Sequence, residues 1–172
     1  MIGIELALAT ALSATPPTDP IAPAKNGMLQ CYTPNPDRKT CRALASYRID
    51  PKGLIDNIAV VLINADQLIS MKTHEPVTVK AGAICGQIHR TSIQAAEFEV
   101  AGQAASPDQA ETLRSQVTAA YDSLFGKEIC TSYRLDGSVY QATATIDGKP
   151  SPDAAADTVI WVSPGDGYTV GR

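Results

Sequence analysis

Four cysteines are the residues of this 172-residue chain with the most distinctive chemistry: Cys31, Cys41, Cys85 and Cys130. They include no C-x-x-C pair, which is the spacing typical of zinc sites and of redox centres. An even number of cysteines without such pairs favours two disulfides, and disulfides form in exported proteins. The alternative is four buried free thiols in a cytosolic domain.

Side-chain alternation favours one of the three pairings that four cysteines allow. In the segments around Cys85 and Cys130, apolar residues occupy every second position, and each cysteine lies in the other set of positions. If both segments are strands, each cysteine faces away from the apolar side of its strand, and the two can meet across a sheet. This predicts Cys85–Cys130, and leaves Cys31–Cys41 as a local clasp.

The two histidines, His74 and His89, offer little support for catalysis. His74 adjoins Glu75, but neighbouring residues of a strand point to opposite faces. His89 follows Cys85 by four residues, which on a strand separates them by about 13 Å, too far for a thiol–imidazole pair. We therefore predict no catalytic dyad at either histidine.

Paired carboxylates are another catalytic arrangement, since glycosidases use two of them. Glu97 and Glu99 share one strand face, but they alternate with Phe98 and Val100 in the manner of a solvent-exposed face. The chain has no G-x-S-x-G, P-loop, H-E-x-x-H or EF-hand motif. The sequence thus predicts no catalytic residue, no metal ligand and no cofactor.

One loop combines an aromatic residue with positive charge. Tyr32, Arg38, Lys39 and Arg42 lie within or beside the segment that a Cys31–Cys41 bridge would close. A loop closed by a disulfide has already lost part of its conformational freedom, which lowers the entropic cost of binding. We take these four residues as a candidate partner-binding loop. The alternative is a structural role, in which the disulfide-closed loop only protects an edge of the sheet from pairing with another strand.

The remaining pattern predicts a sheet of short strands. The run 58–63 (IAVVLI) is typical of a strand covered on both faces. The segments 68–72 and 76–80 are predicted as separate strands, and Asp136-Gly137 lies between two alternating runs, which is a hairpin signal.

One amphipathic helix is predicted over about 107–125. Ser106 is a suitable N-cap and Gln109 completes a capping box, while Leu113 and Val117 recur at helical spacing. The predicted fold class is therefore α+β: a mainly antiparallel sheet of about eight to ten short strands with one packed helix and two disulfides.

Residues 1–24 differ from the rest of the chain. An apolar stretch, residues 2–14, precedes a proline-rich segment. Together they resemble a secretory leader that is cleaved after Ala14 or after Ala24. No basic residue precedes the stretch, and Glu5 lies within it. The alternative is an ordinary N-terminal tail or helix. We predict a leader over 1–24 and a single domain over 25–172.

Composition narrows the function classes. The formal net charge of −4, without a basic run, disfavours nucleic-acid binding, and no apolar run approaches the roughly 18 residues of a membrane span. The layout is typical of small exported bacterial proteins. We predict a periplasmic or secreted, non-catalytic domain that binds a protein or small ligand in the cell envelope. The alternative is a small carboxylate-dependent hydrolase or a thiol-dependent oxidoreductase.

Overall fold

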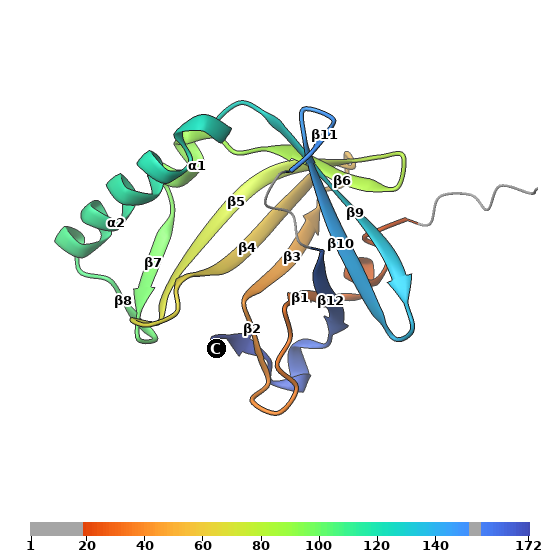
Figure 1. Cartoon of the computed structure of the whole chain (residues 1–172), viewed down its shortest axis with the longest axis horizontal. Coiled ribbons are helices and arrows are strands. Elements are labelled where there is room, and N and C mark those ends of the chain that lie inside the picture. Colours follow the sequence, from red (N-terminus) through yellow and green to blue (C-terminus); the bar gives the residue numbers. More distant parts are fainter. Residues whose placement is uncertain (1–18, 152–155) are drawn as a thin grey trace, which may run out of the picture.

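The predicted strands close into a barrel (Figure 1). The computed structural model describes residues 19–151 and 156–172. The barrel strands are β1 (Leu29–Tyr32), β3 (Ala43–Ile49), β4 (Ile55–Asn64), β5 (Ile69–Lys80), β6 (Ala83–Gln87), β9 (Glu128–Asp136), β10 (Val139–Ile146) and β12 (Asp157–Val162). Each is antiparallel to the next barrel strand along the chain, and β12 pairs with β1 to close the ring. The predicted antiparallel α+β class is broadly correct, and an eight-stranded barrel is the more specific description.

Tight turns join several barrel strands because their backbones adopt left-handed conformations. Between β5 and β6, Ala81 and Gly82 have φ values of 48° and 80°, as a two-residue hairpin turn requires. The predicted hairpin is confirmed, but its two-residue turn is Gly137-Ser138 and not Asp136-Gly137, because Asp136 still pairs with Val139. Gly137 has a φ of 62°. Glycine adopts this conformation at little steric cost.

Strand β5 corrects the prediction of two strands over 68–72 and 76–80, because it runs unbroken for 12 residues. Its first residues pair with β7 (Glu97–Val100) and its last with β6, whereas residues 73–76 pair with β4 alone. Pro76 lies in this stretch. A proline has no N–H for a ladder, so it normally ends a strand that has two neighbours. Here one neighbour is missing, and the strand continues.

A helical insertion separates β6 from β9. It contains α1 (Arg90–Gln94), β7, β8 (Gln103–Ala104), α2 (Pro107–Ala120) and the 3-10 turn η2 (Asp122–Leu124). The predicted helix corresponds to α2 with η2, and the capping box is present: Gln109 N donates to Ser106 Oγ, and Ser106 N donates to Gln109 Oε1. The second helix, α1, was not predicted, because five residues are too few to show helical periodicity. No helix within the described ranges is long and apolar enough to cross a membrane.

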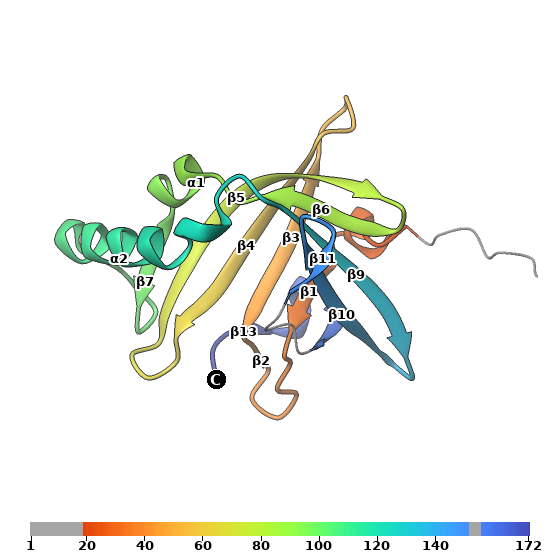
Figure 2. The ribbon, with the colours of Figure 1, turned by 45° about the horizontal axis from the view of Figure 1, so that its top comes forward.

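The inserted helices pack on one side of the barrel, and the N-terminal turn lies on the opposite side in both views (Figures 1 and 2). A buried cluster fixes the helices there: Met71, Ile93, Ala96, Phe98 and Val117. Val117 is the only buried residue of α2. The helix is thus held by a narrow stripe, and much of its barrel-facing side remains accessible.

The segment before β1 closes one end of the barrel. Ile21, just before the 3-10 turn η1 (Pro23–Asn26), and Ala24, within it, are only 2% and 7% exposed. They pack with buried Ile84, and the half-buried residues around them are Tyr47, Ile55, Val77, Tyr133 and Trp161. Residues 19–24, assigned above to the leader, are therefore part of the folded domain, and Ile21 and Ala24 belong to its core. The other residues of the predicted leader, 1–18, lie outside the described residues.

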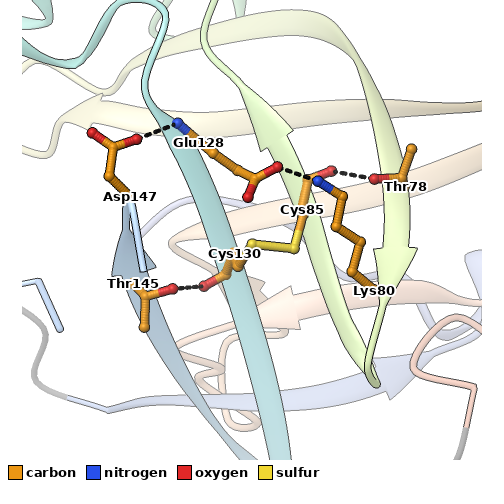
Figure 3. Close-up of a disulfide and its surroundings, with 7 residues drawn as sticks. All are labelled: Thr78, Lys80, Cys85, Glu128, Cys130, Thr145 and Asp147. Atoms are coloured by element: carbon orange, nitrogen blue, oxygen red, sulfur yellow. Dashed lines mark hydrogen bonds and ion pairs between the residues drawn. A yellow bond between two sulfur atoms is a disulfide. The ribbon is translucent and has the colours of Figure 1, made fainter. Parts of the chain in front are cut away.

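Both predicted disulfides are present. Cys85 of β6 lies directly opposite Cys130 of β9, as the alternation argument requires, and the bridge joins the two strands on their shared face (Figure 3). Lys80 forms an ion pair with Glu128 beside it, and Glu128 N donates to the carboxylate of Asp147 over 3.0 Å. The helical insertion begins after β6 and ends before β9, so the bridge joins the two strands that flank it.

The other bridge joins β1 to the strand on which the C-terminal segment pairs. Cys31 lies in β1 and Cys41 in β2 (Thr40–Cys41), and both are fully buried. Strand β2 pairs in parallel with β13 (Thr169–Val170), and Tyr168 packs against the bridge. The remaining short elements are β11 (Lys149–Pro150) and η3 (Pro164–Asp166).

Candidate functional site

The four residues of the predicted partner-binding loop have different surroundings, although Arg42 N donates to the carbonyl of Tyr32 over 2.9 Å. Arg38 and Lys39 are exposed on the turn that the Cys31–Cys41 bridge closes, and Lys39 Nζ donates to the carbonyl of Asp166 over 2.9 Å. Arg42 lies beyond the turn. Tyr32 points into the barrel, where its hydroxyl contacts Gln30 and Tyr133. The alternation along β1 shows which residues share a face of the strand, but it does not show which of the two faces lines the barrel interior.

The interior of the barrel holds a polar cluster around Gln30, which is 1% exposed. Its Oε1 accepts from the hydroxyls of Tyr47 over 2.6 Å and Tyr32 over 3.2 Å. The Tyr32 hydroxyl also contacts that of Tyr133, from β9, over 2.5 Å. Gln30 Nε2 has no hydrogen-bond partner among the described residues. The cluster, together with Ile21, occupies the lumen, so the middle of the barrel is packed with side chains.

These tyrosines predict a loss of stability at alkaline pH. Burial raises the pKa of Tyr32, Tyr47 and Tyr133 above the ordinary value of 10.0. The folded protein therefore keeps them neutral where the unfolded chain ionises, so their contribution is complete below about pH 10 and is lost as the pH rises further. We expect the free energy of unfolding to fall by about 1.4 kcal/mol per pH unit for each tyrosine. Urea unfolding across this range measures it.

The matched variant is Tyr47→Phe, which removes one ionising hydroxyl and keeps the ring. It should unfold with a shallower pH dependence above about pH 10 than the wild-type protein. An unchanged slope would show that Tyr47 does not contribute to the alkaline loss.

The histidines have partners that the sequence did not reveal. His74 and Glu75 point to opposite faces, as predicted. His74 Nδ1 lies 3.1 Å from Asp56 Oδ2, and His89 Nδ1 lies 2.9 Å from Glu75 Oε2. Both pairs join residues at least 14 positions apart, so no local spacing could indicate them.

The Glu75–His89 pair resembles part of a catalytic arrangement, in which a carboxylate orients an imidazole. Glu75 Oε1 also accepts from the backbone N–H of His89 over 3.1 Å, and His89 is the N-cap of α1. The carboxylate therefore fixes the start of the helix. In the described parts of the chain, no serine, threonine or cysteine side chain hydrogen-bonds to His89, and all four cysteines are bridged.

The predicted carboxylate pair lies on the surface. Glu97 and Glu99 are both exposed, and Glu97 Oε1 pairs with Lys72 Nζ over 3.1 Å. No cavity of the two described below includes either residue in its lining. Across residues 19–151 and 156–172, no group of three or more histidine, cysteine, aspartate or glutamate residues is placed to hold a metal ion.

A groove of about 910 Å³ lies between α2 and strands β4, β5 and β7. Its apolar lining residues are Val61, Leu62, Ile63, Ile69, Val100, Leu113, Val117, Ala120 and Tyr121. The polar lining residues are Asn64, Gln67, Gln109, Thr112 and Gln116, with Arg42 and Asp108 as the charged ones. Concave sites of this size with mainly apolar walls and a few polar groups are typical of small-molecule binding.

A second cavity, of about 550 Å³, adjoins the groove and shares Arg42, Leu62 and Ile63 with it. Its other walls come from the turn 33–36 and from Gly171 and Arg172 near the C-terminus. The run 58–63, predicted to be covered on both faces, is half-buried throughout, and its last residues line both cavities. The apolar run therefore extends beyond the elements that pack on it. An apolar run of this kind is the sequence signal that could have indicated this site.

No family model matches the chain, and comparisons with curated proteins and with solved structures find no match.

Proposed function

We propose that the protein is an exported, non-catalytic domain that binds a small, mainly apolar ligand in the groove between α2 and strands β4 and β5. The groove itself carries this proposal. It has the volume of a small-molecule site, apolar side chains on both walls and a polar rim. Helix α2 buries only Val117, so a ligand in the groove would cover apolar surface that the fold leaves accessible.

The two disulfides are consistent with a small secreted or exported domain. Bridges of this kind persist in oxidising compartments. The predicted leader supports the same destination, the periplasm or the external medium. Because Ile21 and Ala24 belong to the core, we propose that the leader is removed after Ala14 and not after Ala24.

The competing function is a small hydrolase that would use Glu75 and His89. The distance of 2.9 Å between them fits a carboxylate that orients an imidazole. The second contact of Glu75, with the backbone of His89, supports a structural role instead. Neither residue lines the groove or the adjoining cavity.

Filling the groove tests the proposed function. Gln116 lines it on α2, while its neighbour Ser115 is exposed and outside the lining. We expect the neutral fluorescent probe N-phenylnaphthylamine to bind the wild-type protein. The Gln116→Trp variant should bind it about tenfold or more weakly, because the indole occupies the ligand's space. Fluorescence titration measures both.

Ser115→Trp is the matched control, since it adds the same ring to the next position of the same helix. It should bind the probe as the wild-type protein does. Equal binding by all three proteins would place the ligand outside the groove, and a wild-type protein that binds no probe would contradict the proposed function.

A further inference from the structure

The groove and the adjoining cavity meet at one positive charge. Arg42 lines both, and its side chain makes no ion pair or hydrogen bond with any residue that the structure describes. Arg172, the other arginine in the two linings, is already engaged: it pairs with Asp66 over 3.6 Å and donates to the carbonyl of Ala65. Arg42 is therefore the cation available to a ligand at this junction.

Charge in the two linings is unevenly distributed. Asp108 is the only acidic residue lining the groove, and no acidic side chain lines the adjoining cavity. Asp108 lies in the first turn of α2 and forms no ion pair with Arg42 within the described chain. A guanidinium presents a planar fork of donors that matches a carboxylate, so an anion is the complementary group at the junction.

The apolar walls define the rest of the ligand. Val61 and Ile63 from β4 and Leu113 and Val117 from α2 all line the groove. A flexible alkyl chain can follow such a groove and bury its methylene groups at a gain for each one. A ligand with an apolar chain and a charged head would therefore use both features at once.

We propose that the ligand is a linear amphiphile with a carboxylate head, whose alkyl chain lies in the groove and whose carboxylate binds Arg42. This assignment rests on the proposed function, because it names the chemical class of the ligand that the groove takes. Arg42 is the residue that selects the head group, and the walls of the groove select the chain.

Three probes of equal chain length distinguish the contribution of the head group from that of the chain: dodecanoate, dodecanol and dodecylammonium. Each is titrated calorimetrically below the concentration at which it forms micelles or, for dodecanol, separates from solution. We expect the wild-type protein to bind dodecanoate more tightly than the other two. Arg42→Gln should weaken dodecanoate binding by about tenfold, because a charge-assisted hydrogen bond is lost at a partly exposed site. It should leave dodecanol binding unchanged, which also shows that the variant is folded.

The controls are Arg134→Gln, an exposed arginine on β9 outside both linings, and Arg42→Lys, which keeps the charge but loses the fork. The first should bind dodecanoate as the wild-type protein does, and the second should lie between wild type and Arg42→Gln. If dodecanol binds as tightly as dodecanoate, or if Arg42→Gln binds both unchanged, the carboxylate assignment is wrong and the proposed function stands. If no alkyl probe binds while N-phenylnaphthylamine does, the linear-amphiphile assignment is wrong and the proposed function stands. If neither kind of probe binds, the proposed function itself fails.

Discussion

Replacing Ile21 with alanine should lower the free energy of unfolding by about 2–5 kcal/mol, the range for removing a buried aliphatic side chain. Ile21 is 2% exposed and closes the end of the barrel against Ile84 and five half-buried neighbours. Its loss would leave a cavity that the strand ends cannot fill, because their hydrogen-bond ladders fix the backbone. Urea unfolding followed by tryptophan fluorescence measures the change, since Trp161 packs in the same cluster.

Leu54 provides the matched control. It belongs to the same end of the barrel, in the turn between β3 and β4, but it is 68% exposed. Leu54→Ala should change the free energy of unfolding by less than about 0.5 kcal/mol. Similar losses for Ile21→Ala and Leu54→Ala would mean that Ile21 does not act as a plug.

The same measurement bears on where the leader ends. A chain that starts at Thr15 keeps Ile21, and Asp19, whose carboxylate accepts from Ile21 N over 3.1 Å. A chain that starts at Lys25 loses both residues and Ala24. We expect the first to match the stability of the exported protein and the second to be at least as unstable as Ile21→Ala. The intact mass of the exported protein identifies its first residue, and a start at Lys25 would contradict the proposed exit after Ala14.

Removing the Cys85–Cys130 bridge should cost about 4 kcal/mol, and removing Cys31–Cys41 about 3 kcal/mol, on the chain-entropy model of disulfide stabilisation. The bridged residues are 45 and 10 positions apart, so the first closes the larger loop. That loop is the helical insertion between β6 and β9. The double variants Cys85→Ala/Cys130→Ala and Cys31→Ala/Cys41→Ala, compared by urea unfolding, test both values.

Treatment with a reductant distinguishes the effect of breaking the disulfide bond from the effect of replacing the cysteine side chains. It should destabilise the wild-type protein and leave the variant with all four cysteines replaced unchanged. Alkylation of the native protein should detect no free thiol. Modification of four thiols under those conditions would remove the disulfides and, with them, the argument for an oxidising compartment.

Local patterns were enough to predict several elements because the interactions that form them are local. The capping box of Ser106 and Gln109, the helix that follows it and the hairpin at Asp136-Gly137 each depend on residues a few positions apart. The Cys85–Cys130 pairing needed only the two-residue alternation of strands, which holds at any distance along the chain.

The sequence by itself determined most of the strands, although not the continuity of β5, and also the main helix, the disulfide pairing and the absence of familiar catalytic motifs. The tertiary structure alone decided that β1 pairs with β12, that Tyr32 therefore faces the lumen, and that Glu75 meets His89. It also placed α2 and β4 on opposite sides of the groove, which Arg42 lines as well. These contacts join segments that are far apart in the sequence, and their geometry depends on closure of the barrel. Barrel closure produces no periodic pattern in the sequence of the residues that it brings together.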